Sequence, residues 1–361
     1  PALYPTTLRY LELLGAPLRA FPLTVTLYDT RTGGTLLLPP LRRGRVGWSA
    51  FRPRNLRQLV AFRRLLEHTP TGAGPEGDRF SLEEVLGGAG ASRSMLEEIF
   101  YPIALSGWCV ELDEFRHYSA YNVMSYLQAS IPPGITPSAW VEVSGGMRAY
   151  FAAAAAQMPR ASLRLDAGVA CVRRARGAYE IVTERGEVAE CDHVVLATNA
   201  REAARLVGEV EEAEQLRGML GSLRYMTTRI AIHGDRRLMP PERADWSVVN
   251  TRFDGSHSHN TMWKSWRQPA GADLFKSWVT FLPEAPAPLY AERAFEHALT
   301  DRRYYEVQRE LAALQGLGGI WVCGVYTRDI DSHESAITSG LAVAQRLAPT
   351  SARLARLRQT T

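Results

Sequence analysis

Apolar and polar residues alternate along the first part of the chain in the pattern of paired strands. Residues 23–29 alternate as one strand, and after a turn at residues 31–34 the run TLLLPP continues as a second, so a hairpin is predicted. Residues 55–67 then change to the helical period, and residues 95–126 continue it with breaks, the first of them at Pro102. We therefore expect a hairpin followed by a helix-rich region.

Side chains also mark where shorter elements begin. Residues 4–14 predict a short helix that a threonine caps. Ser81 stands three residues before Glu84, the spacing of a capping box, so a helix is expected to start there. Between these helices, residues 69–79 read TPTGAGPEGDR, and this richness in glycine and proline predicts a loop.

The second half of the chain contains two continuous apolar runs, which are typical of strands covered on both faces. They are HVVLAT at residues 193–198 and IWVCG at residues 320–324, and each precedes a helical pattern. A meander of short strands at residues 161–192 leads to the first run. We expect the two runs to be neighbouring parallel strands of one layered domain, despite their separation in sequence.

Alternating strands at residues 224–233, 261–266 and 276–282 indicate a different sheet, made mostly of antiparallel strands. Helices of residues 95–127 are expected to pack on it. This order of elements fits one domain built from separated pieces of chain, with a second domain inserted into it.

Composition indicates an ordinary globular protein of more than one domain. The chain has 361 residues, of which 46% are hydrophobic and 22% charged. The formal net charge is +4, and arginine supplies almost all of the positive charge, because Lys264 and Lys276 are the only lysines. Six arginines cluster near the N-terminus, namely Arg42, Arg43, Arg45, Arg52, Arg54 and Arg57. No nucleic-acid-binding motif accompanies them, so we expect a solvated face or, as the alternative, contact with an anionic lipid or acyl-carrier surface.

Cysteine spacing and hydropathy bear on the compartment. Cys109, Cys171, Cys191 and Cys323 form no C-x-x-C pair, and three of them lie in apolar runs, which indicates buried thiols in a reducing compartment. No signal-peptide pattern opens the chain, and no apolar run approaches the ~20 residues of a membrane span. A soluble, cytoplasmic protein is the expectation.

The stretch GIWVCGVYTRDIDSHESAITSG places small residues where a strand ends and a helix begins. Gly324 stands at the expected strand end, and Ser335, Ala336 and Ser339 lie on neighbouring turns of one helix face. Small residues allow a ligand to approach closely, and free N–H groups at a helix start attract anions. A plain packed helix gives the same pattern, so the residues alone leave both interpretations open.

Several segments together resemble a known superfamily. The segments GGMRAY, LRLDAGVACVRR and DHVVLATNA resemble the body of flavin-dependent amine oxidases and phytoene-type desaturases, in which a Gly-Gly turn precedes a helix and a strand pair leads to D-x-V-V-x-A-T. GIWVCGVYTRDIDSHESAITSGLAVAQRL is similar to their C-terminal flavin-binding element. YPTTLRYLELLG and RYMTTRIAIHGDRRLMP resemble a bacterial branch described as predicted NAD/FAD-binding oxidoreductases, and the resemblance covers nearly the whole chain.

The resemblance implies a mixed α/β, two-domain fold with FAD as the cofactor. It assigns residues 1–140 mainly to a helical substrate domain, 141–208 to the flavin domain, 209–315 to the substrate-domain sheet and 316–361 to the flavin domain again. It also implies a set of cofactor-binding residues, with His333 as the catalytic candidate. They are Val169, Ala197, Thr198, Gly324, Val325, Ser332, His333, Glu334, Ser335 and Ala336.

The chain departs from the superfamily pattern in two places. Members begin with a strand, G-x-G-x-x-G, a helix and an acidic residue, an element that holds the dinucleotide, and this sequence lacks it. A truncated chain, a partner chain that supplies the unit, and a protein that has lost FAD are the three explanations, and without the unit FAD binding should be weak or absent. Val325 replaces an aspartate that is common in amine oxidases, and Thr227, Thr228 and Arg229 occupy the strand that often carries their lysine, so an amine substrate is not the first expectation.

The expected chemistry is hydride transfer to a flavin from an apolar small molecule or acyl chain. Trp108, Trp263 and Trp266, with Tyr121, are candidates for the substrate cavity, although large aromatic residues more often belong to a core.

Two other functions stay open, an amine or amino-acid oxidase of a secondary pathway and a flavin-free relic that acts as a binding or scaffold subunit. His257 and His259 have one residue between them in a polar loop, so we expect solvent-exposed side chains and no metal site.

Overall fold

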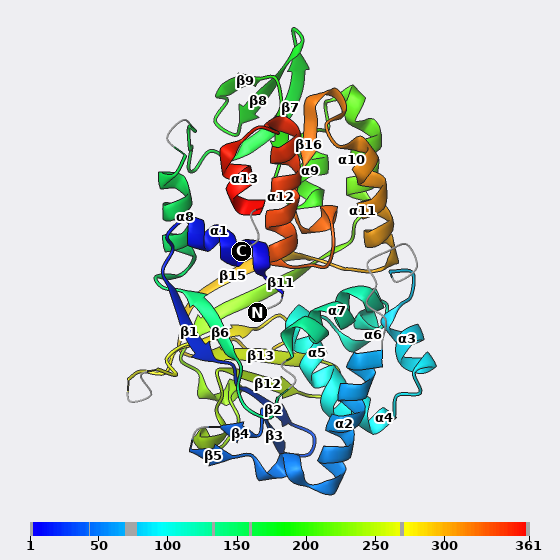
Figure 1. The fold of residues 1–361 in the computed structure, drawn as a ribbon, viewed down its shortest axis with the longest axis vertical. Helices are drawn as coiled ribbons and strands as arrows, with labels where there is room; N and C mark the ends of the chain where they lie inside the picture. The colour runs from blue at the N-terminus through cyan, green and yellow to red at the C-terminus, as the bar shows by residue number, and fades with distance from the viewer. Residues whose placement is uncertain are drawn as a thin grey trace. The chain divides into compact units, whose positions relative to one another are not determined.

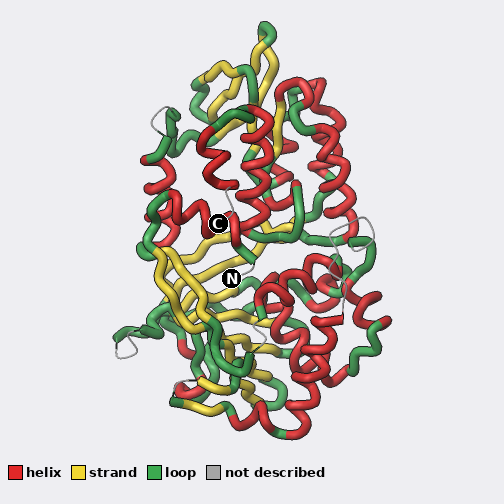
Figure 2. Tube along the Cα trace, viewed as in Figure 1, coloured by secondary structure: helices red, strands yellow, loops and turns green. Residues whose placement is uncertain are grey.

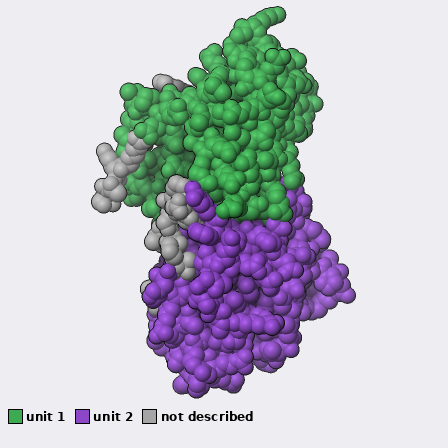
Figure 3. Space-filling view, turned by 90° about the vertical axis from the view of Figure 1, so that its right-hand side faces the viewer, with its two compact units in different colours: residues 1–19, 141–224, 298–361 green, residues 20–140, 225–297 purple. Residues whose placement is uncertain are grey.

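A computed structural model describes residues 3–42, 44–68, 78–131, 134–158, 161–267 and 271–358. Within these residues the chain forms two compact units (Figure 3). Unit 1 consists of residues 1–19, 141–224 and 298–361, and unit 2 of residues 20–140 and 225–297. Most of the loop predicted at residues 69–79 lies outside the described residues.

Unit 1 is built around a pair of parallel strands, β10 (Val194–Leu196) and β16 (Ile320–Val322). Val194 pairs with Ile320, so the prediction that HVVLAT and IWVCG are parallel neighbours is confirmed. Beside this pair, a three-stranded antiparallel sheet forms the predicted meander from β7 (Val169–Ala175), β8 (Ala178–Thr183) and β9 (Val188–Cys191). In the described part of the chain, the helices of unit 1 are α1 (Pro5–Leu13), α8 (Gly146–Ala156), α9 (Ala200–Leu206), α10 (Glu214–Gly221), α11 (Arg302–Leu314), α12 (His333–Leu347) and α13 (Ala352–Arg358) (Figure 1).

The first apolar run is covered on one face only by the described residues. Val194 and Leu196 are 4% and 3% exposed, whereas Val195, which points to the opposite face, is 44% exposed. The expectation that this strand is covered on both faces is therefore wrong for the described chain. The second run differs, because Ile320, Trp321 and Val322 are all buried.

Unit 2 contains a seven-stranded sheet in the order β15-β11-β14-β13-β12-β2-β3. Five of the strands are β11 (Tyr225–His233), β12 (Val249–Phe253), β13 (Ser258–Trp263), β14 (Phe275–Trp278) and β15 (Leu289–Ala298). The others, β2 (Val25–Asp29) and β3 (Gly34–Leu38), form the predicted hairpin, with Val25 opposite Leu38. The pairs β11–β14, β14–β13, β13–β12 and β2–β3 are antiparallel, and β12 with β2 is parallel, so the prediction of a mostly antiparallel sheet is confirmed.

Helices of unit 2 gather on one side of this sheet (Figures 1 and 2). They are α2 (Pro53–His68), α3 (Leu82–Gly88), α4 (Arg93–Met95), the π-helical turn η2 (Leu96–Phe100), α5 (Tyr101–Trp108), α6 (Leu112–Phe115) and α7 (Ala120–Ser130). Helix α5 is fastened to β13, because Ser258 Oγ donates to Pro102 O at 2.7 Å and Asn260 Nδ2 donates to Ser106 O at 3.1 Å. The predicted packing of residues 95–127 on the sheet is confirmed.

Short elements complete the chain. The predicted capping box is present, since Ser81 Oγ accepts from Glu84 N and the Glu84 carboxylate accepts from Ser81 N. Helix α1, by contrast, begins after Tyr4 with a proline in its first turn and no side-chain cap, so the predicted threonine cap is wrong. Strands β1 (Leu18–Pro22) and β6 (Ala139–Val143) pair with each other, as do β4 (Leu41–Arg42) and β5 (Arg45–Val46).

The compact units start and end at residues different from most of the predicted segment boundaries. Unit 1 includes residues 1–19, 209–224 and 298–315, although the predicted segments place these residues in the substrate domain. The segments 1–140, 141–208, 209–315 and 316–361 were assigned by function, and as functional segments they stay predictions.

Candidate functional site

Gly324, just after strand β16, occupies a position where the backbone and its neighbours favour glycine. Gly324 has a φ of 148°, a conformation that L side chains rarely adopt. A Cβ added there would lie 2.8 Å from the ring of Tyr326, while the backbone N–H of Gly324 donates to Ser339 Oγ at 2.8 Å. The predicted small residues Gly324 and Ser339 therefore bring the strand end against helix α12.

Helix α12 starts beside this strand end with free main-chain donors. Ser332 caps the helix, because its Oγ accepts from Ser335 N at 3.1 Å and its carbonyl accepts from Ala336 N at 3.2 Å. The N–H groups of His333 and Glu334, in the first turn, have no acceptor among the described residues. Such N–H groups and the helix dipole make this end of unit 1 suitable for an electron-rich group.

The side chain of Glu334 has a structural partner. Its carboxylate accepts hydrogen bonds from Thr6 N, Thr7 N and Thr7 Oγ1, each 2.8 Å long. Thr6 and Thr7 lie in the first turn of α1, whose N–H groups would otherwise lack acceptors. Glu334 therefore joins the start of α1 to the start of α12, and its carboxylate is engaged by α1.

His333, the catalytic candidate, lies in the first turn of α12. Its ring meets that of Tyr150 edge-on, with the centroids 6.0 Å apart. Partial burial of the imidazole lowers the pKa of His333, and the neighbouring Glu334 carboxylate opposes this shift. A lowered pKa favours the neutral ring, a form that can accept one hydrogen bond and donate another.

The other predicted cofactor residues also belong to unit 1, but not to one cluster. Ala197 and Thr198 are exposed and follow β10, the neighbour of β16, and Thr198 O lies 3.7 Å from the Cβ position of Gly324. Val325 begins the short turn η7 (Val325–Thr327) directly after that glycine. Val169 starts β7 in the separate three-stranded sheet, where its carbonyl accepts from Arg205.

The aromatic candidates of unit 2 belong to packed clusters. Trp108 is 3% exposed and lies 5.2–6.4 Å, between ring centroids, from Phe115, Tyr118 and Tyr126. Tyr121 is likewise buried. Trp263 and Trp266 are half-buried, with Trp246 edge-on to the former and Phe21 tilted against the latter. None of the four candidates, Trp108, Tyr121, Trp263 and Trp266, lines the apolar cavity described next.

Unit 2 contains an apolar cavity of about 460 Å³ that the sequence analysis missed. Helix α2 contributes Leu56, Leu59 and Val60 to its wall. Strand β2 contributes Val25, and strand β3 contributes Leu38. Arg63 and Arg64 are its basic lining residues, and the mouth includes apolar side chains that are more than a third exposed. The signal was present in the sequence, because α2 has apolar residues on more than one face.

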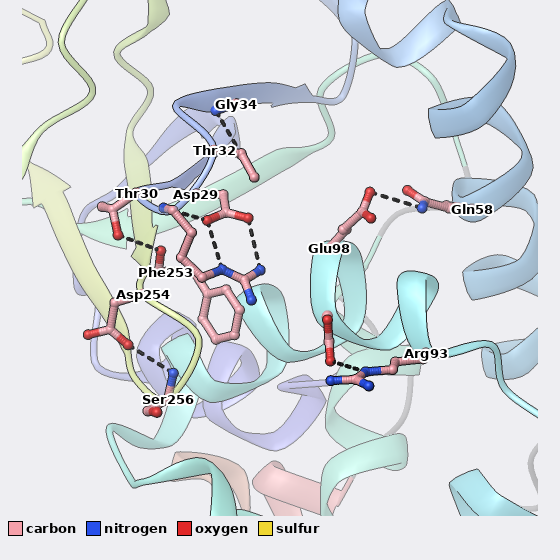
Figure 4. Close-up of polar contacts among 12 residues, drawn as sticks. Asp29, Thr30, Thr32, Gly34, Gln58, Arg93, Glu98, Phe253, Asp254 and Ser256 are labelled. Atoms are coloured by element: carbon pink, nitrogen blue, oxygen red, sulfur yellow. Dashed lines mark hydrogen bonds and ion pairs between the residues drawn. The ribbon is translucent and has the colours of Figure 1, made fainter.

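A second cavity of unit 2, of about 550 Å³, has several charged residues in its lining. Figure 4 shows polar contacts among some of them. The carboxylates of this cavity are all paired: Asp29 with Arg31 at 2.9 Å, Glu97 with Arg93 at 2.6 Å, and Glu98 with Arg54. Figure 4 shows Gln58 facing Glu98 from the neighbouring helix, with Gln58 Nε2 donating to Glu98 Oε2 at 2.9 Å. Paired carboxylates offer little to a positively charged ligand.

The expectation that His257 and His259 are solvent-exposed is wrong. His259 is 7% exposed, because strand β13 turns its side chain into the unit. His257 is half-buried, because the ring of Phe281 covers it. Both imidazoles face the carboxylate of Asp254, which precedes them in the β12–β13 hairpin.

Comparison with known proteins identifies the family and the fold. The model of the family described as flavin containing amine oxidoreductase matches residues 2–257. No curated protein matches the chain. The predicted resemblance is confirmed by this match. A separate finding is that none of the described helices has the length and apolarity to cross a membrane.

Solved structures with a similar fold include enzymes of different activities. The CLA-producing fatty acid isomerase from P. acnes has a TM-score of 0.67 and 11% identity, over 96% of this chain and 85% of that chain. Wild-type putrescine oxidase bound to putrescine has a TM-score of 0.60 and 13% identity, over 95% and 85%. Cyclohexylamine oxidase from Brevibacterium oxydans IH-35A has a TM-score of 0.59 and 13% identity, over 95% and 85%. At these identities the likeness shows the fold, and the predicted mixed α/β, amine oxidase-like fold is confirmed.

Proposed function

Because the chain belongs to the flavin containing amine oxidoreductase family, we propose that it is an FAD-dependent oxidoreductase acting on an apolar small molecule or acyl chain. The observation that carries the proposal is the strand end at Gly324 beside the unpaired N–H groups of α12. Only glycine fits this strand end, because an added Cβ would lie 2.8 Å from the ring of Tyr326, and the chain therefore passes here without a side chain that could block a ligand.

The residues present fit a flavin. Gly324 and Val325 would admit its ribityl chain, and Ala336, in the first turns of α12, has a small side chain that would not obstruct it. The N–H groups of His333 and Glu334 would face the electron-rich edge of the ring system. FAD, when bound, would supply the hydride acceptor, and these residues would orient it, with the imidazole of His333 available for a hydrogen bond.

The substrate class rests on unit 2. Its apolar cavity suits a hydrocarbon chain, and Arg64 at its lining has no ion-pair partner among the described residues, so an acidic head group would complete the contact. That the fatty acid isomerase from P. acnes has a similar fold agrees with this class. An amine is the alternative that the two oxidases suggest, but the carboxylates of the second cavity of unit 2 are already paired with arginines.

Flavin content and substrate class can be tested together. The protein as its natural gene encodes it is purified, the released flavin is quantified, and flavin reduction is followed with fatty acids and with primary amines. Flavin at near-stoichiometric occupancy with reduction by fatty acids supports the proposal, and reduction by amines alone selects the alternative. Protein that neither contains nor takes up FAD would overturn both.

A matched pair of glycine variants links the flavin to this site. Gly324→Ala should lose FAD, because the new Cβ is both strained and within 2.8 Å of the Tyr326 ring. Gly340→Ala, in the interior of the same helix α12 and with nothing within 4 Å of its Cβ position, should keep FAD. Equal FAD content in the two variants would place the flavin elsewhere.

A further inference from the structure

The tip of the β12–β13 hairpin brings a carboxylate and two imidazoles together. Asp254 Oδ1 accepts a hydrogen bond from the backbone N–H of Ser256 at 2.9 Å (Figure 4). It also accepts one from the backbone N–H of His257 at 2.7 Å, and the two bonds fix the carboxylate. The other oxygen, Oδ2, faces His257 Nδ1 at 3.3 Å and His259 Nε2 at 3.6 Å. One ligand atom from each of the three residues lies within 4.8 Å of the others.

Hydrogen bonds alone satisfy this arrangement poorly. The contact to His259 Nε2 is longer than a hydrogen bond, and the contact to His257 Nδ1 is at the long end of the range. A metal ion among the three ligand atoms would replace these long contacts with shorter bonds.

The surroundings hold the rings in place. His257 stacks on Phe281, with the ring centroids 4.5 Å apart and the planes at 25°. Its Nε2 is buried without a hydrogen-bond partner among the described residues and faces Glu111 Oε1 at 3.6 Å. The hairpin tip is tied to the same segment, because Leu112 N donates to Ser256 O at 3.0 Å.

We propose that Asp254, His257 and His259 bind one divalent transition-metal ion of the Zn²⁺ type, a site separate from flavin chemistry. Two ligands about 2.0–2.1 Å from a tetrahedral zinc ion are about 3.3–3.4 Å apart. The distances from Asp254 Oδ2, 3.3 and 3.6 Å, need little adjustment to reach that value. Two imidazoles favour Zn²⁺ over Mg²⁺ or Ca²⁺, and water takes the fourth position.

Glu111 completes the site without touching the metal. With His257 Nδ1 on the ion, the proton of its ring is on Nε2, the atom that faces the Glu111 carboxylate. Carboxylates that accept from a metal-bound histidine in this way orient the ring and strengthen binding. The ion thus joins the hairpin tip to the start of α6.

Zinc titration of untagged, EDTA-treated protein tests the site. Calorimetry should give one ion per chain, and Co²⁺ in place of Zn²⁺ should give the intense visible absorption of a four-coordinate ion. Asp254→Asn and His257→Gln should each weaken Zn²⁺ binding by more than about 100-fold, and Glu111→Gln by about 10-fold. His68→Gln, which changes an exposed histidine of α2 in the same unit, should leave the affinity unchanged.

Thermal unfolding of the metal-free variants keeps these results interpretable. If Asp254→Asn lowers the unfolding temperature, its loss of Zn²⁺ binding could come from misfolding. The Zn²⁺ affinity of His257→Gln and the Co²⁺ spectrum of the unaltered protein then decide whether the metal site exists. Absence of Zn²⁺ binding, an unchanged affinity in the His257→Gln variant, or a Co²⁺ spectrum of a six-coordinate ion would each overturn the proposal.

Discussion

The two units offer ligands different kinds of surface. In unit 1 the candidate flavin site consists of main chain, with Gly324 and the N–H groups at the start of α12, and its side chains matter because they are small. In unit 2 the apolar cavity and the hairpin cluster consist of the side chains themselves. A main-chain site should be damaged by added volume, whereas a side-chain site should be damaged by lost or altered groups.

Added volume at the start of α12 should have the largest effect. Ala336→Leu should weaken FAD binding by about 10- to 100-fold, because overpacking costs about 1–3 kcal/mol. Ala342→Leu, on an exposed part of the same helix, should bind FAD normally. Fluorescence titration with FAD measures both, and an Ala336→Leu variant with wild-type affinity would show that "SHESAITSG" is an ordinary packed helix.

Removal of a charged group from unit 1 should act on stability. Glu334→Ala removes three hydrogen bonds to α1 and should lower the free energy of unfolding by about 2 kcal/mol, since bonds to a charged group are the stronger ones. Glu12→Ala, which removes an exposed ion pair of α1 with Arg9, should cost less than about 0.5 kcal/mol. Urea unfolding compares them, and equal losses would mean that the Glu334 contact contributes nothing.

Added volume can also be tested in unit 2. Leu59→Trp should fill part of the cavity and weaken binding of a fluorescent fatty acid by about 10-fold, whereas Leu289→Trp on strand β15 should not. If both variants bind the probe as the unaltered chain does, the cavity of about 460 Å³ does not take the acyl chain.

Much of the fold could be predicted from local pattern. The parallel pairing of β10 and β16 followed from two apolar runs before helices, and the cap at Ser81 from a spacing of three residues. The predicted threonine cap of α1 was wrong, because the N–H groups of its first turn donate to the carboxylate of Glu334. Glu334 lies 327 residues from Thr7 in sequence. A local pattern contains no sign of such a partner.

The candidate sites show the same division. Small residues at Gly324 and Ser339 could be recognised, since their size and order along the chain are local properties. The burial of His259 and its approach to Asp254 could not, because a hairpin turn and the ring of Phe281 create that environment. Trp108 reads as a pocket residue or a core residue by sequence alone, and only its three aromatic neighbours place it in a core.

The smallest expected effect concerns Asp235, a carboxylate of unit 2 that, like Glu334 in unit 1, accepts main-chain N–H groups. Asp235 is 4% exposed and accepts from Arg237 N at 2.9 Å, from Ala287 N at 3.0 Å and from the Arg237 guanidinium. Burial alone would raise the pKa of Asp235, but these donors outweigh it and lower the pKa from 3.8 to about 2.

A lowered pKa in the folded state stabilises the fold only while the group is ionised. The contribution of Asp235 is therefore complete above pH 4 and is lost as the pH falls from about 4 to about 2. Over that window the unfolding free energy of the unaltered chain should fall by about 1 kcal/mol more than that of Asp235→Asn, a modest value because Arg237 is well solvated. Asp113→Asn, which changes a carboxylate 90% exposed, should keep the slope of the unaltered chain. Parallel acid-dependence curves for the unaltered chain and Asp235→Asn would mean that solvent screens this carboxylate as fully as one on the surface.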